Sequence, residues 1–201
     1  NTLNEYVSSY YTNLGRQISK GFTGIVQYYI FRDFDKRLTW SLRGTIRMES
    51  SKLDGLGNVL ESLNNYGQNR STRRYYDGAD PDDIWAVRSA GIDPATGKEV
   101  FIKKDGTRTF DFNYEDEVVV GNTRPDMEGT IGSNFGYKGF TAGFTFRYRI
   151  GGNVFNNAIY TKVENIPSSS LVYNQDKRAL YDRWQKAGDI AQYKNIANST
   201  S

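Results

Sequence analysis

The sequence of 201 residues contains neither cysteine nor histidine. The missing cysteines exclude disulfide bonds and thiolate metal sites, while an oxidising compartment stays permitted. The missing histidines remove the commonest general base and metal ligand, so Ser-His-Asp and Cys-His catalysis are both excluded. There is no phosphate-binding Gly-Lys-Ser/Thr loop either. Carboxylate-pair catalysis stays formally open, but we expect no enzyme activity, no catalytic residue and no cofactor.

Long apolar runs are also absent. A membrane-spanning helix needs ~20 consecutive apolar residues, and no segment approaches that length, so a helical membrane protein is excluded. Only a β-barrel could cross a bilayer. Mean hydropathy is −0.67, and aromatic residues make up 14%, with 15 tyrosines against 2 methionines. This profile is typical of a β-rich chain whose apolar residues are spread over one face.

The charges are balanced, with 26 basic and 23 acidic residues and a net charge of +3. This excess is too small and too scattered to indicate a nucleic-acid partner. The chain starts at Asn1 without a signal-like segment and stops in a Ser/Thr/Asn tail. We therefore expect both ends to be cut from a longer protein.

Residues 37–49 alternate strictly between two kinds of side chain. One face carries Leu38, Trp40, Leu42, Gly44, Ile46 and Met48, and the other carries Arg37, Thr39, Ser41, Arg43, Thr45, Arg47 and Glu49. Side chains of a strand point alternately to opposite sides, so this pattern predicts a two-faced strand. Residues 21–32 repeat it more loosely, with Ile30 on the face of Tyr28 and Phe31 on the other. A short turn at 33–36 joins the two strands.

A second hairpin is predicted at 127–137 and 140–150, with the tight turn at Lys138-Gly139. We expect this turn to lie at the same end as the turn at 33–36. Soluble strands usually run ~5–6 residues, whereas thirteen residues at ~3.3 Å each, tilted by ~40°, reach ~33 Å and cross a ~25 Å apolar band. Length therefore favours a transmembrane barrel over a soluble sandwich.

The barrel interpretation fixes an orientation for each strand. Leu38, Trp40, Leu42, Ile46, Phe144 and Phe146 should face lipid, and Arg43, Arg47, Arg147 and Arg149 should face the lumen. A slip by one residue would move all four arginines into hydrocarbon, at ~2–4 kcal/mol each near the midplane. The arginines could attract anionic or hydroxyl-rich solutes, or pair with Glu49, Glu128 and carboxylates of an absent plug domain. Structural pairing is the favoured reading.

The segments 50–126 and 151–201 are expected to be long extracellular loops with small elements of their own. Leucines at 53, 56, 60 and 63 have helical spacing, residues 100–110 suggest a hairpin around Asp105-Gly106, and a helix is expected at 176–186.

Few loop residues suggest a site. Tyr75, Tyr76 and Trp85 could stack on a sugar or clamp a substrate, although such aromatics more often pack their own loop. Arg43 and Arg147 are the other weak candidates for substrate binding. The acidic group Asp77, Asp80, Asp82 and Asp83 could bind Ca²⁺, but a solvated turn is the better reading because the spacing fits no known loop.

Several stretches in order resemble the C-terminal barrel region of SusC/RagA-type TonB-dependent transporters. They are Trp85 to Phe101, Val120-Gly-Asn-Thr-Arg-Pro125, Tyr137-Lys-Gly-Phe140 with the strand ending Arg149-Ile-Gly-Gly152, Asn174 to Arg178 and Arg183 to Ile190. Together they span residues 85–190, just over half the chain.

The resemblance implies one all-β domain over 1–201, a fragment of a 22-stranded antiparallel β-barrel without its plug. It also implies a place in the outer membrane of Bacteroidetes, a SusD-like surface lipoprotein as partner, and energy from TonB through the missing N-terminal region. The cargo would be an oligosaccharide or a peptide. Four strands cannot close a barrel. Two alternatives stay open: a barrel assembled from several chains, and a soluble or surface-exposed β-rich glycan-binding or adhesin module.

Overall fold

A computed structural model describes residues 13–196 except 69–70, 167–169 and 171. In chain order the elements are β1 (Arg16–Asp33), β2 (Leu38–Asp54), α1 (Glu61–Gly67), β3 (Asp83–Ala86), β4 (Arg88–Ile92), β5 (Glu99–Ile102), β6 (Arg108–Thr109), η1 (Tyr114–Asp116), β7 (Val118–Asn122), β8 (Met127–Tyr137), β9 (Phe140–Ile150), α2 (Asn157–Ile159), η2 (Tyr160–Glu164) and α3 (Arg178–Tyr181). The chain divides into a sheet unit, residues 1–83 and 122–152, and a loop unit, residues 84–121 and 153–201. No helix in the described ranges is long and apolar enough to span a membrane.

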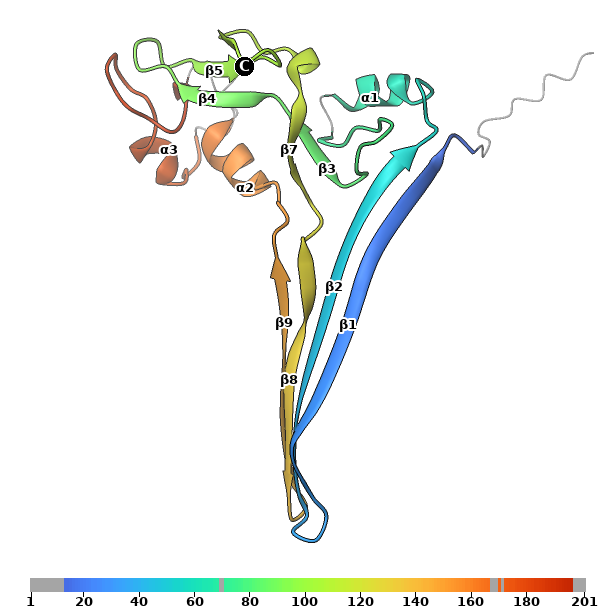
Figure 1. Cartoon of the computed structure of the whole chain (residues 1–201). Coiled ribbons are helices and arrows are strands. Elements are labelled where there is room, and N and C mark those ends of the chain that lie inside the picture. Colours follow the sequence, from blue (N-terminus) through green and yellow to red (C-terminus); the bar gives the residue numbers. More distant parts are fainter. Residues whose placement is uncertain (1–12, 69–70, 167–169, 171, 197–201) are drawn as a thin grey trace, which may run out of the picture. The chain divides into compact units, whose positions relative to one another are not determined.

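The sheet unit contains one four-stranded antiparallel sheet with the order β1-β2-β8-β9. Leu38 pairs with Asp33 on one side and with Tyr137 on the other, so both tight turns lie at the same end, as Figure 1 shows. The Lys138 amide donates to the Arg37 carbonyl at 3.0 Å. Lys138 and Gly139 both have positive φ, which matches the right-handed twist of a hairpin. The expected pair of hairpins with turns at one end is confirmed.

The first two strands are longer than the alternation predicted. β8 and β9 occupy 127–137 and 140–150, but β1 begins at Arg16 and β2 ends at Asp54. The added turn-distal ends carry mainly polar side chains, so they lack the apolar face that marks a strand in sequence. Cross-strand polar contacts pair them instead, including the Ser19–Ser51 hydroxyl contact at 2.9 Å and the Arg16–Asp54 ion pair at 2.6 Å.

A β-bulge at Ile30 corrects the predicted faces of β1. Tyr29 pairs with Ser41, whereas Phe31 pairs with Trp40, so Ile30 is the extra residue. Strict alternation had placed Phe31 on the polar face, but the bulge moves it to the apolar face. There its ring lies 6.0 Å from that of Trp40.

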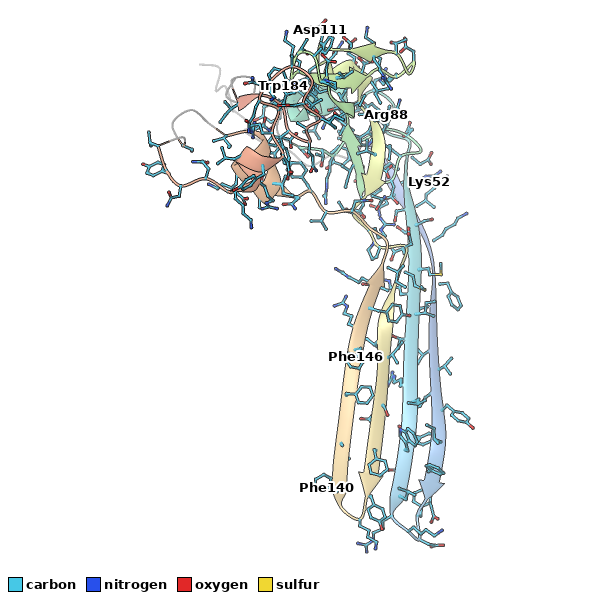
Figure 2. All side chains as sticks on the ribbon, turned by 90° about the vertical axis from the view of Figure 1, so that its left-hand side faces the viewer. Lys52, Arg88, Asp111, Phe140, Phe146 and Trp184 are labelled. Atoms are coloured by element: carbon cyan, nitrogen blue, oxygen red, sulfur yellow. The ribbon has the colours of Figure 1, made fainter. Side chains whose placement is uncertain are left out.

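The two faces of the sheet separate apolar from charged side chains. One row of cross-strand neighbours joins Leu42, Ser133 and Phe144, and the adjacent row on the other face joins Arg43, Gly132 and Thr145. The apolar face is largely uncovered by the described residues: Phe22 is 62% exposed and Phe146 is 67% exposed. Figure 2 shows Phe140 and Phe146 projecting from β9. Within the described residues of the sheet unit, no second sheet packs over this face, as a soluble sandwich would require.

The two helices expected in the loops are shorter than predicted. Leu53 belongs to the end of β2, and the helix α1 starts only at Glu61. Gly55 and Gly57 both have positive φ, which interrupts the helical spacing of the leucines. The helix expected at 176–186 is shortened to α3, because Asp189 accepts the Gln185 and Lys186 amides and folds that stretch into a turn. The hairpin around Asp105-Gly106 is confirmed as β5 paired with β6.

The loop unit has a small core of its own. Val163, Ile166, Ala179 and Tyr193 are buried together. Arg183 is also buried, and its guanidinium donates to the carbonyls of Ala179 and Lys194, both at 2.7 Å, and to that of Val163. Burial lowers the pKa of Arg183, although the nearby Glu164 carboxylate opposes this. One arginine thus joins three segments of an otherwise irregular loop.

Candidate binding site on the polar face of the sheet

The polar face carries ion pairs, both within one strand and between strands, near the end of the sheet distant from the tight turns. Glu128 of β8 accepts from Arg149 at 3.1 Å and from Arg147 at 3.2 Å, both on β9. On β2, Arg47 pairs with Glu49 two residues along the same face. The favoured structural pairing of Arg47, Arg147 and Arg149 with Glu49 and Glu128 is therefore confirmed. These pairs remain partly solvated, with 66% of the Arg147 side chain exposed.

Arg124 joins the loop before β8 to the acidic loop after α1. Its guanidinium donates to Asp82 at 2.6 Å and 3.1 Å, to Asp80 at 3.1 Å and to the Ser51 hydroxyl at 3.0 Å. Burial alone would lower the pKa of Arg124, but the Asp82 hydrogen bond and the two carboxylate charges outweigh it and raise the pKa. The guanidinium stays charged, and its hydrogen bonds connect the loop before β8 and the loop after α1 to Ser51 of β2.

The acidic group considered as a Ca²⁺ site is occupied by internal hydrogen bonds. Asp77 accepts the amides of Leu56 and Gly57 at 2.7 Å and 3.0 Å, which lowers the pKa of its carboxyl group. Asp83 accepts the Asp80 amide and the Asn122 side chain, both at 3.0 Å. In the described ranges no group of three acidic, His or Cys side chains is arranged to hold a metal ion. The expected solvated turn is instead a loop whose carboxylates, partly buried at Asp80, Asp82 and Asp83, are hydrogen-bonded to neighbouring segments.

A pocket of about 420 Å³ lies between these charged groups. It is lined by Gln17, Arg47, Glu49, Asp82, Thr123, Arg124, Pro125, Glu128 and Arg149. All nine belong to the sheet unit. Three guanidinium and three carboxylate groups line one small volume, so the pocket offers charge-assisted hydrogen bonds of both polarities. Thr123 carries the one hydroxyl of the lining, and this hydroxyl donates to the Asp82 carbonyl at 3.2 Å.

The residues singled out from the sequence lie elsewhere. Arg147 adjoins the pocket through Glu128, whereas Arg43 lies nearer the tight turns, opposite Gln27 and Gly132. Tyr75 is half-buried. Its backbone amide donates a hydrogen bond to the Asn64 side chain, and its carbonyl accepts one from the same side chain. Tyr76 is 44% exposed in the sheet unit. Trp85 lies in β3 within the loop unit, so the three aromatics are divided between the two units.

Sequence reasoning missed Arg124, Gln17 and Thr123 as pocket residues. The alternation predicts the first strand only over 21–32, whereas Gln17 lies inside β1 opposite Leu53. Thr123 and Arg124 stand in the stretch Val120 to Pro125, which was noted only for its resemblance. An arginine before Pro-Asp in a predicted loop was the available signal.

No family model matches the sequence, and no curated protein matches it either. The fold is similar to solved structures of the RagAB peptide transporter, with a TM-score of 0.74 and 18% identity over 96% of this chain and 21% of that chain. The RagAB peptide importer in its open-open state gives a TM-score of 0.72, 18% identity and the same coverages. Its closed-closed state gives a TM-score of 0.62 and 18% identity over 92% of this chain and 21% of that chain. The chain spans about a fifth of the length of the chains it matches.

These comparisons concern the fold. A β-rich chain with antiparallel sheets resembles a part of RagA, and its described strands form an open sheet whose edges β1 and β9 do not pair. The matched structures are those of a transporter.

Proposed function

We propose that this chain forms part of the wall of an outer-membrane transporter of the SusC/RagA kind that imports peptides. The observation that carries the proposal is the four-stranded sheet with two unlike faces. Its strands are 11–18 residues long, one face is apolar and uncovered, and both tight turns lie at one end. A sheet of this kind fits a lipid-facing barrel wall, with short turns on one side of the membrane and long loops on the other.

The remaining parts of the proposal follow from the resemblance to part of RagA. The missing strands and the plug would belong to the same single barrel domain, and β1 and β9 would pair with further strands at the free edges. Energy would come from TonB through an N-terminal region. A SusD-like surface lipoprotein would cover the loops, just as the RagAB complex contains two components.

The charged pocket supports a peptide cargo over an oligosaccharide. A peptide carries an ammonium and a carboxylate group, and the pocket lining contains three carboxylate–guanidinium pairs, Glu49–Arg47, Asp82–Arg124 and Glu128–Arg149, that a peptide's two charged ends can join. None of the nine lining residues is aromatic, so the pocket has no ring face on which a sugar could stack. Arg149 is the candidate contact for the peptide carboxylate, with Glu49 and Asp82 for the ammonium group.

Cysteine labelling tests the membrane placement: residues 1–201 contain no cysteine, and the protein without an introduced cysteine is the control for labelling elsewhere. Phe146→Cys and Thr145→Cys make a matched pair, because these neighbours lie on opposite faces of β9. In the full-length protein in outer membranes, a lipid-phase reagent should modify Phe146→Cys, and a charged aqueous reagent should modify Thr145→Cys. Modification of both variants by the aqueous reagent alone would favour the soluble or surface-exposed binding module instead.

An uptake assay tests the cargo. Arg149→Gln should reduce uptake of a short peptide with a free carboxyl terminus by about fivefold, the equivalent of ~1 kcal/mol for a solvated charged pair. Uptake of the same peptide with an amidated terminus should change little. Arg37→Gln, in the distant tight turn, is the control. Equal losses for both peptides would contradict recognition of the carboxylate, and uptake of oligosaccharides alone would overturn the peptide proposal.

A further inference from the structure

The apolar face of the sheet changes character near the end distant from the tight turns. Phe22 of β1 pairs with Met48 of β2, and beyond this pair the same face carries Lys20 opposite Ser50 and Lys52 opposite Ile18. Lys20 and Lys52 are both exposed. Figure 2 shows Lys52 near the end of β2 distant from Phe140. The face that is aromatic and aliphatic along most of its length thus becomes cationic.

The two lysines are close enough to act together. Because Lys20 pairs with Ser50, and Lys52 lies two residues beyond Ser50, they are diagonal neighbours about 7–8 Å apart at the backbone. Two flexible four-carbon side chains can bring their ammonium groups onto one anion from this spacing.

The neighbouring charges leave this patch positive. On this face, between Arg16 and Phe22 and between Met48 and Asp54, the one carboxylate is Asp54. It is already paired with Arg16 at 2.6 Å. Glu49 lies on the opposite face, toward Arg47. The two ammonium groups therefore face outward without a compensating carboxylate among the described residues of these two strand ends.

The height of the patch matches the membrane surface. From Leu38 to Lys52 the strand rises about fourteen residues at ~3.3 Å, which is ~35 Å along the membrane normal at a tilt of ~40°. The apolar band of a barrel wall is ~25 Å tall, and a headgroup layer lies beyond each of its edges. With Leu38 at one boundary, both lysines lie in the opposite headgroup layer, where lipid phosphates are found.

We infer that Lys20 and Lys52 form a binding site for the phosphate group of an anionic lipid at the membrane surface on the long-loop side. The inference rests on the proposed function, because it requires the apolar face to contact lipid. Phe22 and Met48 would pack against the acyl chains while the two ammonium groups hold the phosphate. Cations at a membrane surface gain about 1 kcal/mol each from anionic lipid. The site would fix the depth of this edge of the sheet and collect anionic lipids around it.

Lipid selectivity measures the site directly. The full-length protein is reconstituted in phosphatidylcholine bilayers, and the association of spin-labelled phosphatidic acid is compared with that of spin-labelled phosphatidylcholine. Lys20→Gln with Lys52→Gln should reduce the preference for phosphatidic acid about fivefold per lysine, the factor that corresponds to ~1 kcal/mol. Lys104→Gln is the matched control, since this exposed lysine lies outside the four-stranded sheet. It should leave the preference unchanged.

The outcomes separate the two proposals. If Phe146→Cys reacts with the lipid-phase reagent while the lysine variants keep the wild-type lipid preference, the phosphate site is overturned and the membrane placement stands. If Phe146→Cys reacts only with the aqueous reagent, the membrane placement fails, and the lipid site fails with it. An equal loss of preference in the Lys104→Gln control would show a general charge effect and would also overturn the site.

Discussion

Replacing Gly97 with alanine should loosen the contact that holds Trp184 in the loop unit. Gly97 has a φ of +69°, and a Cβ there would lie 2.5 Å from two ring carbons of Trp184. The left-handed backbone costs an alanine about 1–2 kcal/mol. Moving the indole also breaks the hydrogen bond from its Nε1 to the Pro94 carbonyl, 2.9 Å long and worth about 0.5–1.5 kcal/mol. The expected loss of local stability is ~2–3 kcal/mol.

Hydrogen exchange can measure this loss at two reporter amides. Gly188 donates to the Pro94 carbonyl at 2.8 Å and Asn195 to the Gly97 carbonyl at 3.2 Å. Both should exchange about thirtyfold faster in Gly97→Ala, the factor for ~2 kcal/mol. Gly106→Ala is the control, because Gly106 also has positive φ but a Cβ there meets nothing within 4 Å. Exchange that is unchanged in Gly97→Ala, or equally fast in both variants, would refute the reasoning.

Three further predictions concern the sheet unit. Arg124→Gln should lower the stability of the sheet unit by about 2–4 kcal/mol in thermal unfolding, because two partly buried carboxylates lose their cation. Arg73→Gln is the control and should change the stability little, because Arg73 forms only an exposed ion pair with Asp82 at 3.9 Å. Equal melting temperatures for the two variants would contradict this. Gly129→Ala should prevent recovery of folded protein, since its Cβ would lie 1.9 Å from a carbonyl oxygen of β2, while Gly44→Ala has open space and should fold. Backbone hydrogen bonds lower the pKa of Asp77 below the ordinary 3.8, so the stability it provides is present above pH 3.8 and is lost as the pH falls through the folded-state pKa. Hydrogen exchange of the Leu56 and Gly57 amides, which donate to Asp77, should become faster as the pH falls through this pKa in the wild type. The same pH dependence should be absent in Asp77→Asn.

Alternation predicted the strands well because the side-chain period of a strand can be read directly from sequence. It found β8 and β9 at their observed limits. It failed at the turn-distal ends of β1 and β2, from Arg16 to Lys20 and from Ser50 to Asp54, where both faces are largely polar. There the pairing depends on cross-strand contacts between residues more than thirty positions apart, and a local pattern contains no such information. The bulge at Ile30 could not be predicted for the same reason, because it shows only in the pairing of β1 with β2.

The charged pocket could be predicted only in part. Arg47 and Arg149 were placed correctly on the polar face, because each alternates with apolar neighbours. Arg124 lies outside any periodic segment, and its partners Asp80 and Asp82 stand 44 and 42 residues away in the chain. Which loop carboxylates meet which loop cation depends on how two irregular segments fold back onto β2. Neither propensity nor hydrophobic period describes such a path.

The register of the sheet links the two proposed binding surfaces. Arg47 and Glu49 line the pocket, while Met48 and Lys52 on the same strand point to the other face. A slip of β2 by one residue would exchange both sets, so neither surface would survive. Side-chain contacts set this register on both sides of β2: Ser51 meets Ser19 of β1 at 2.9 Å, and Thr45 meets Thr130 of β8 at 2.8 Å. The Tyr148 hydroxyl of β9 reaches past Gly129 to the Thr45 carbonyl at 2.8 Å, so contacts from three strands hold β2 in the one register that keeps the arginines of β2 on the face opposite Leu42 and Met48.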